Sequence, residues 1–306
     1  MKRILVIRGG AIGDFIVTLP ALKALRERFP DAAIEILGYK HIAALVENRF
    51  YANAVRSIEY AVLSGFFAKG GQLDQELCGY FASFDLVISY LFDPDEIFET
   101  NLRRAGVREI LRGPAKIQPG LPATRQLAAP LEELQIKATD HVPNLFPSTD
   151  DRDFARNFLE GFPATVIALH PGSGSLQKNW PLDKWIDLGN RLLASGGRLL
   201  VISGEADQSQ LRILESQWRD RGVRFAVNLP LPSLAAILAD CFFVGHDSGI
   251  SHLAAAAGAK CILLFGPTDP DVWAPPGENV RVIRAPGGDL AKLSVEAVLD
   301  AMWERP

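Results

Sequence analysis

Residues 3–14 read RILVIRGGAIGD and set the expectation for the whole fold. The unbroken apolar run Ile4–Ile7 is typical of a strand in a parallel sheet that is covered on both faces. A glycine-rich turn follows it. Residues 15–29 then carry apolar side chains at helical spacing, with Pro20 in the first turn or two, where proline costs least. The stretch therefore predicts a strand, a tight turn and a helix over Phe15–Phe29.

The same alternation recurs along the chain. The expected strands of the first half are Arg3–Arg8, Ala33–Gly38, Ala54–Glu59, Phe84–Ser89 and Val107–Leu111. Those of the second half are Thr165–His170, Arg198–Ser203, Arg224–Val227, Cys241–Val244, Lys260–Phe265 and Val280–Ile283. The main helices expected between and after them are Leu182–Ala194, Asp207–Arg221, Leu234–Ala239, Ser248–Ala257 and Leu293–Trp303. Repeated strand–helix units predict an α/β protein with two Rossmann-like, doubly wound parallel sheets and a cleft between them.

A boundary is expected near the middle of the chain. Residues 112–124 are rich in glycine and proline, a short helix is expected over 123–136, and VPNLFPSTDD at 142–151 resembles a linker. These features predict domains of residues 1–147 and 148–306. The last helix is expected to pack either on its own domain or back on the first domain.

Composition and charge exclude several classes of protein. The chain has 306 residues, of which 48% are hydrophobic and 22% charged, and its formal net charge is −4. These values are typical of a folded globular chain. They argue against long disorder, and the absence of a Lys/Arg block argues against a nucleic-acid-binding surface.

Targeting and redox signals are weak. No apolar run approaches the ~20 residues of a membrane span, and the apolar core near the start is shorter than that of a signal peptide. The expected location is the cytoplasm. Cys78, Cys241 and Cys261 are odd in number and predict reduced core residues rather than a disulfide framework.

Ligands of doubly wound sheets bind at the carboxyl ends of the strands. The first strand ends in Arg8, followed by a turn with Gly10, Gly13 and Asp14. This turn fits neither a dinucleotide fingerprint nor a Walker A loop. Asp14 has two interpretations: it caps the following helix, or it accepts a proton from a substrate hydroxyl at the cleft.

The first strand of the second half leads into a loop suited to phosphate. Its last residue is His170, and Gly172, Ser173 and Lys178 follow before the Trp180-Pro181 helix start. Backbone N–H groups and one cation suit an anion. The alternative is a flexible loop with a solvated lysine.

A second anion site is expected where residues 241–244 lead into a helix. Asp247, Ser248 and Gly249 open that helix, and His252 lies at helical spacing from Ser248. Free N–H groups in a first turn favour a negative charge. His252 is read as a ligand contact or as a buried histidine, and His246 as a loop side chain. The spacing of these residues predicts no metal site.

Two further loops complete the candidate site. Thr268 and Asp269 follow the strand at Lys260–Phe265, in a turn rich in proline. Glu205 and Asp207 follow another strand, where an acidic side chain suits a ribose diol. The choice between these two carboxylates stays open.

In its ordered motifs the chain resembles glycosyltransferase family 9, the ADP-heptose:lipopolysaccharide heptosyltransferases. The motifs are Arg8…Gly13-Asp14 through Leu19-Pro20-Ala21-Leu22, His170-Pro171-Gly172 with Lys178-x-Trp180-Pro181, Asp247-Ser248-Gly249-x-x-His252-Leu253-Ala254-Ala255, and Gly266-Pro267-Thr268-Asp269-Pro270. The resemblance implies a GT-B fold with the acceptor in the first domain and the donor in the second. It implies inverting transfer of a heptose or similar sugar from an ADP-sugar, without a metal or other cofactor.

The residue reading supplies a matching mechanism. Asp14 acts as general base on the acceptor hydroxyl, while Arg8, Gly10 and Gly13 lie on the acceptor side. On the donor side Lys178 and the helix start at 247–249 stabilise the leaving diphosphate. The remaining donor contacts expected are His170, Gly172, Ser173, Glu205, His252, Thr268 and Asp269. Another GT-B enzyme, such as a nucleotide-sugar epimerase, and a non-catalytic nucleotide-sugar-binding protein are the alternatives.

The resemblance also implies partners and a place. The acceptor is expected to be a saccharide or a lipid-linked saccharide of lipopolysaccharide core synthesis, with no nucleic acid involved. Peripheral contact with the cytoplasmic face of the inner membrane is the open alternative to a purely cytoplasmic protein. An anionic acceptor would call for a basic patch on the first domain. Its candidate residues are the lysine and arginines at positions 23, 26, 28, 103, 104, 108 and 112.

Overall fold

A computed structural model describes residues 1–162, 165–204 and 208–303. The chain forms two compact units, Met1–His141 and Val142–Pro306. The predicted division after residue 147 lies six residues further along the chain than this one. Glu205 and Asp207, the two candidate ribose contacts, fall outside the described residues.

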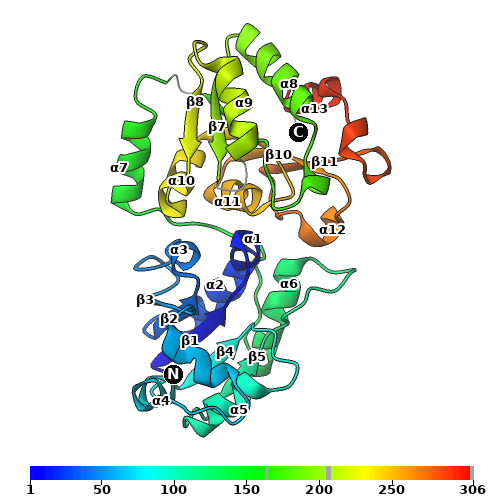
Figure 1. Cartoon of the computed structure of the whole chain (residues 1–306). Coiled ribbons are helices and arrows are strands. Elements are labelled where there is room, and N and C mark those ends of the chain that lie inside the picture. Colours follow the sequence, from blue (N-terminus) through cyan, green and yellow to red (C-terminus); the bar gives the residue numbers. More distant parts are fainter. Residues whose placement is uncertain (163–164, 205–207, 304–306) are drawn as a thin grey trace. The chain divides into compact units, whose positions relative to one another are not determined.

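The first unit is built on five parallel strands in the order β3-β2-β1-β4-β5 (Figure 1). The strands are β1 (Arg3–Arg8), β2 (Ala33–Gly38), β3 (Ala54–Ser57), β4 (Leu86–Ser89) and β5 (Ile110–Arg112). The helices are α1 (Ile12–Ile16), α2 (Leu19–Arg28), α3 (Lys40–Ala43), η1 (Ala61–Phe67), α4 (Gln75–Ala82), α5 (Ile97–Arg104), α6 (Ala123–Ala128) and η2 (Ala129–Leu134).

Alternating side chains of β1 explain why this sheet is covered on both faces. Leu5 and Ile7 lie in one apolar cluster with side chains of η1, α4 and α5, such as Phe66 and Phe81. Ile4 and Val6 point to the other face and are equally buried. The continuous apolar run in the sequence follows from this two-sided burial, and the predicted parallel sheet is confirmed.

Two helix predictions in this unit are wrong as single elements: the helix expected over 123–136 is α6 followed by the 3-10 helix η2. The expected helix over Phe15–Phe29 is two helices, α1 and α2, separated at Val17 and Thr18. Pro20 is the second residue of α2, and its ring is incompatible with a helix that runs on from Ile16. The Thr18 hydroxyl donates to the Asp14 carbonyl across the break, at 2.8 Å.

The second unit contains six parallel strands in the order β11-β10-β9-β6-β7-β8 (Figure 1). They are β6 (Val166–His170), β7 (Arg198–Ser203), β8 (Arg224–Val227), β9 (Cys241–His246), β10 (Lys260–Phe265) and β11 (Val280–Arg284). The helices are α7 (Thr149–Phe158), η3 (Leu176–Lys178), α8 (Leu182–Ala194), α9 (Gln208–Trp218), α10 (Leu231–Leu238), α11 (Gly249–Ala257), α12 (Pro270–Trp273), η5 (Pro286–Gly288), η6 (Leu290–Lys292) and α13 (Val295–Trp303).

Large aromatic side chains fill the core of this unit. Trp180, Trp185 and Trp218 are each 1% exposed and lie in one cluster with side chains of β6, β7, α8 and α13. The last helix, α13, packs on α8, β10 and β11 of its own unit. Its return to the first unit stays a prediction.

The cysteine and membrane predictions have mixed outcomes. All three cysteines are free thiols; Cys241 and Cys261 are buried, whereas Cys78 is only partly buried. Among the described residues no helix has both the length and the apolar character needed to cross a bilayer.

Candidate functional site

Both sheets reverse their strand order at a central pair of strands. In the first unit β1 pairs with β2 on one side and with β4 on the other. In the second unit the corresponding pair is β6 and β9, with His170 in register with Gly245. The loops after such a pair diverge and leave a crevice for ligands at the carboxyl edge of the sheet. The predicted site loops after β1, β6 and β9 lie at these two points.

The loop after β1 holds the Asp14 carboxylate in a fixed place. Asp14 is the third residue of α1, and its Oδ2 accepts the backbone N–H of Ala11 at 2.9 Å. The side chain is 37% exposed and its Oδ1 lies 3.8 Å from Arg8 Nη2. Asp14 therefore caps the helix through one oxygen and keeps accessible surface. Sequence reasoning had placed it at the cap position itself, which Ala11 occupies.

Arg8 is buried and stabilises this loop. The residue is 7% exposed, and its guanidinium donates twice to the Asp14 carbonyl, at 3.1 and 2.8 Å. Burial lowers the pKa of Arg8, and the nearby Asp14 carboxylate and Tyr90 oppose that shift. Gly10 has φ +94°, and a Cβ there would lie 2.8 Å from Asp14 Oδ2. Arg8 and Gly10 thus set the position of Asp14, and Gly13 lies inside α1.

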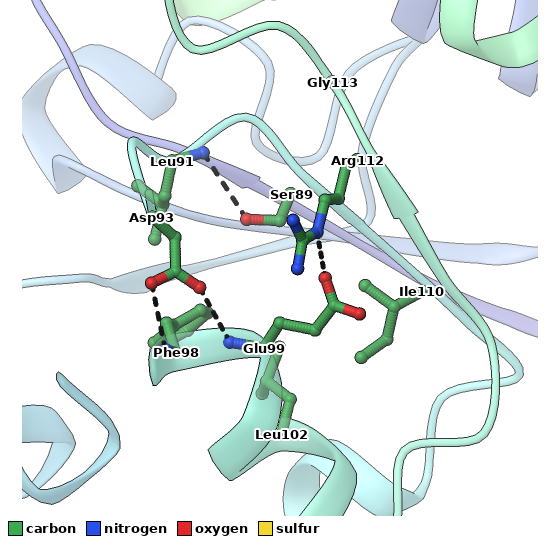
Figure 2. Close-up of a pocket in the computed structure, with 9 residues that line it drawn as sticks. All are labelled: Ser89, Leu91, Asp93, Phe98, Glu99, Leu102, Ile110, Arg112 and Gly113. Atoms are coloured by element: carbon green, nitrogen blue, oxygen red, sulfur yellow. Dashed lines mark hydrogen bonds and ion pairs between the residues drawn. The ribbon is translucent and has the colours of Figure 1, made fainter. Parts of the chain in front are cut away.

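A pocket lies at the carboxyl ends of β4 and β5 in the first unit (Figure 2). Its polar side chains are engaged with one another and with the backbone. Asp93 accepts the N–H groups of Phe98 and Glu99 at the start of α5, at 3.2 and 3.0 Å. Arg112 pairs with Glu99, as the dashed line in Figure 2 shows. Sequence reasoning did not identify this pocket, because its lining comes from three segments, within residues 89–93, 98–102 and 110–113.

The basic side chains expected to form a patch on this unit are mostly engaged. Arg103 and Arg112 share the Glu99 carboxylate. Lys23 lies 2.6 Å from Asp140. Three further arginines contact backbone, amide or aromatic groups: Arg26, Arg28 and Arg104. Carboxylates therefore offset the charge of Lys23, Arg103 and Arg112, and a basic patch on this unit stays a prediction.

In the second unit the predicted lysine and aspartate meet. Lys178 Nζ lies 2.7 Å from Asp247 Oδ2. The Asp247 side chain is 8% exposed and that of Lys178 is 32% exposed. A cation therefore stands in front of the start of α11 with part of its surface accessible. The ion pair joins the loop to the residue that follows β9 and favours the phosphate interpretation of Lys178 over a solvated lysine.

The start of α11 is capped from its own chain. The Ser248 hydroxyl accepts the backbone N–H of Ser251 at 3.3 Å and lies 3.4 Å from His170 Nδ1. Gly249 is the first residue of the helix, and His252 is 4% exposed within it. The N–H groups of Gly249 and Ile250 precede the capped one, and such first-turn groups favour an anion.

The other predicted loop residues have local roles. Ser173 Oγ lies 2.7 Å from both Ser175 O and Asn179 Oδ1, within its own loop. The Gly172 carbonyl lies 3.4 Å from His246 Nδ1. Asp269 caps α12 by accepting the Asp271 N–H at 3.0 Å. Thr268 Oγ1 is buried and has no hydrogen-bond partner among the described residues, so it has capacity left for a ligand.

One residue of this site was misjudged. His246 was expected to be a loop side chain, but β9 extends to it and it is 0% exposed. The short apolar run Cys241–Val244 hid the extension, because Gly245 and His246 are poor strand formers. The buried His246 does not indicate a metal site. Within the described ranges no three His, Cys, Asp or Glu side chains are placed to hold a metal ion.

Two solved structures of heptosyltransferases share this fold. The chain is similar to an Escherichia coli ADP-heptose lipopolysaccharide heptosyltransferase II with a TM-score of 0.79 and 19% identity, over 99% of this chain and 97% of that one. It is also similar to an E. coli heptosyltransferase solved with ADP-2-deoxy-2-fluoro heptose, with a TM-score of 0.70 and 21% identity over 98% of both chains. Two parallel-sheet α/β units of this kind define the GT-B fold.

A family model shows the sequence family of the chain. The model of glycosyltransferase family 9 (heptosyltransferase) matches residues 110–302. The chain therefore belongs to this family. It is 33% identical to lipopolysaccharide heptosyltransferase 1 of E. coli O18:K1:H7 over 156 residues, which are 48% of this chain and 46% of the relative. The chain thus matches about half the length of that relative.

Proposed function

We propose that this protein transfers a heptose from ADP-heptose, or a similar sugar from a similar donor, to a saccharide acceptor. The observation that carries this proposal is the meeting of Lys178 with Asp247 directly before the start of α11, at the reversal point of the second sheet. A cation beside a helix N-terminus suits a diphosphate. The E. coli structure with ADP-2-deoxy-2-fluoro heptose supports the same class of donor.

The second unit is proposed to bind the donor. Lys178 and the first N–H groups of α11 would contact the diphosphate. The hydroxyl of Thr268 and the loop with Gly172 and Ser173 would contact the sugar or the phosphates. His170 and His252 line the same edge of the sheet, since they belong to β6 and α11. Glu205 is proposed for the ribose on the sequence argument alone.

Lys178 would be shared between two anions when the donor binds. With its 32% exposed side chain it can reach a phosphate oxygen while Asp247 stays on its other side. Asp247 would then fix the direction of the ammonium group rather than compete with the donor. Positive groups held in place before reaction lower the cost of the developing charge on the leaving group.

Asp14 is proposed as the general base, and the first unit as the acceptor side. The acceptor oxygen attacks the anomeric carbon as the bond from that carbon to the diphosphate oxygen breaks, and Asp14 takes the hydroxyl proton. This single displacement inverts the anomeric configuration. ADP leaves with the electron pair, stabilised by Lys178 and the α11 N–H groups. No step in this scheme uses a metal ion.

The biological setting is proposed from the relatives' names. Heptosyltransferases 1, 2 and 3 of lipopolysaccharide or lipooligosaccharide are among the curated proteins that the chain resembles. We propose that the acceptor belongs to the lipopolysaccharide core and that the protein works in the cytoplasm, in peripheral contact with the inner membrane. The acceptor itself is proposed only as a saccharide or a lipid-linked saccharide.

Product analysis tests the proposal. The purified protein is incubated with ADP-heptose with and without a core saccharide, and products are separated by mass spectrometry. A heptosylated acceptor and free ADP are expected, unchanged by EDTA. A converted donor without acceptor would indicate an epimerase, and tight donor binding without any product would indicate a binding protein. A loss of activity with EDTA would contradict the metal-free scheme.

A further inference from the structure

The His246 ring is held in one protonation form. Its Nε2 lies 2.7 Å from the backbone nitrogen of Trp180, and its Nδ1 lies 3.4 Å from the Gly172 carbonyl oxygen. A backbone N–H only donates, so Nε2 must accept with a lone pair. The ring proton is then on Nδ1, directed at the Gly172 carbonyl. His246 is therefore a neutral imidazole with a defined tautomer.

The ring is also fixed by aromatic packing. Trp185 lies edge-on to it, with centroids 5.3 Å apart and an interplanar angle of 83°. Trp185 in turn packs edge-on against Trp180 at 5.2 Å. His246 has no exposed surface. The ring therefore has neither the room nor the solvent to turn over and exchange its two hydrogen-bonding atoms.

Gly172 and Trp180, the hydrogen-bond partners of His246, lie near the two ends of the loop at 171–181, called here the Lys178 loop. Gly172 lies near the start of this loop and Trp180 at its end, so one side chain fastens both ends to β9. His246 is also next to Asp247, the carboxylate that Lys178 meets at 2.7 Å. The position of Lys178 relative to the start of α11 thus depends on His246. The ring hydrogen bonds of His246 run to Trp180 and Gly172 rather than to Lys178 or α11.

We infer that His246 is a positioning residue that keeps the Lys178 loop in register with Asp247 and with the α11 N-terminus. The loop positioning stands on geometry alone; its consequence for diphosphate binding rests on the proposed function. A histidine that only fills the core would affect stability equally, but it would not change the environment of Lys178 or the preference for ADP over adenosine.

Two substitutions separate these roles. His246→Met fills a similar volume but removes both ring hydrogen bonds. His246→Gln keeps an oxygen that can accept the Trp180 N–H. Both chains are checked by cooperative unfolding in urea. The competitive acetylation of Lys178 is then compared with that of Lys260, which begins β10 at the opposite edge of the sheet.

We expect Lys178 labelling to rise about fivefold in His246→Met, the scale of one or two lost hydrogen bonds. In His246→Gln we expect a rise of less than about half that size. Unchanged labelling in a folded His246→Met would overturn the inference. Nitrogen-15 NMR of the native His246 ring decides the matter even where that variant does not fold: a proton on Nδ1 supports the role, and a proton on Nε2 contradicts it.

Binding measurements then connect the loop to its ligand. The affinities for ADP and for adenosine are measured in His246→Met, in Lys178→Met and in the double variant. Since His246 acts through Lys178, its roughly fivefold effect on ADP affinity should vanish in the Lys178→Met background. Equal effects in both backgrounds would overturn the inference. A native protein that binds no ADP would instead overturn the proposed function, while the labelling result stays readable.

Discussion

Lys178 Nζ and Asp247 Oδ2 lie 2.7 Å apart although the residues are 69 positions apart in the chain. The pair joins the loop after β6 to the end of β9, the two central strands of the second sheet. It also brings a cation to a helix start. The two residues therefore act together, and substitution of either should be read with the other in mind.

Replacing Lys178 should weaken diphosphate binding selectively. In Lys178→Met the ammonium group is lost while the stem is kept. Hydrogen bonds to charged groups contribute roughly 1.5–3 kcal/mol, so ADP affinity should fall roughly tenfold to a hundredfold. Adenosine affinity should be unchanged. Isothermal titration with both ligands measures the difference, and an equal loss for both would contradict a phosphate role. Lys184→Met, on α8, is the matched control.

The two functions of Asp14 can be separated by a pair of substitutions. Asp14→Asn keeps an oxygen for the Ala11 N–H, whereas Asp14→Ala removes it. Both should lose at least about a hundredfold in turnover, the scale of a lost general base. Only Asp14→Ala should also lose stability, by on the order of 1 kcal/mol. Turnover is followed by ADP release. An active Asp14→Asn would show that Asp14 is only a cap.

Ser248 and Ser148 offer a comparison of two helix caps. Each hydroxyl accepts a backbone N–H three residues on, at the start of α11 and of α7 respectively. Each Ser→Ala change should cost about 1 kcal/mol of unfolding free energy in urea. Only Ser248→Ala should also weaken ADP binding, because α7 has no proposed ligand. Normal ADP affinity in Ser248→Ala would show that this cap does not contribute to the donor site.

Two helical glycines should respond in opposite ways to alanine. A Cβ at Gly189 in α8 would lie 2.3 Å from the Trp218 ring, whereas one at Gly79 in α4 would meet nothing within 4 Å. Gly189→Ala should therefore cost about 1–3 kcal/mol by overpacking. Gly79→Ala should raise the unfolding free energy by roughly 0.5–1 kcal/mol. Urea denaturation compares both with the native chain. A neutral Gly189→Ala would mean that α8 and α9 separate easily.

The buried thiols should make stability fall at high pH. Burial raises the pKa of Cys241 and Cys261 to about 12, against an ordinary value of 9.0. Between these values the unfolded chain has released the proton and the folded chain still holds it. The unfolding free energy therefore falls as pH rises from 9 towards 12, and is unaffected by these groups below pH 9.

A double Cys→Ala variant at positions 241 and 261 tests this pH dependence. Above pH 9 its unfolding free energy should fall less steeply, by up to roughly 1.4 kcal/mol per pH unit for each thiol. Cys78→Ala, at the partly buried position, is the control. Parallel curves for the double variant and the native chain would contradict the argument.

The strands were the most predictable elements. The bounds of β1, β2, β7, β8 and β10 agree with those expected from the sequence. Their apolar runs are continuous because both faces of each sheet are covered, and this signal is local. The helix over Phe15–Phe29 failed because the effect of Pro20 on the preceding turn outweighed an apolar periodicity that continues across the break.

The candidate site was predictable as a set of residues but not as a set of contacts. Glycines, serines and charges after strands indicate the edge where ligands bind, so the loops at 170–181 and 247–252 stood out. The sequence could not predict that Arg103 and Arg112 pair with Glu99, since spacing along the chain does not show which charges meet. The burial of His246 was missed because β9 extends beyond the apolar run Cys241–Val244.

By itself the sequence determined the order of strands and helices, because alternating apolar periods decide which segments bury which faces. From that order follow two parallel sheets and the edge on which their loops gather. Only the tertiary structure decided which strands are neighbours, and hence that Lys178 meets Asp247 and that His246 fastens both ends of the Lys178 loop. Such contacts depend on strand order in space, which local propensity does not encode.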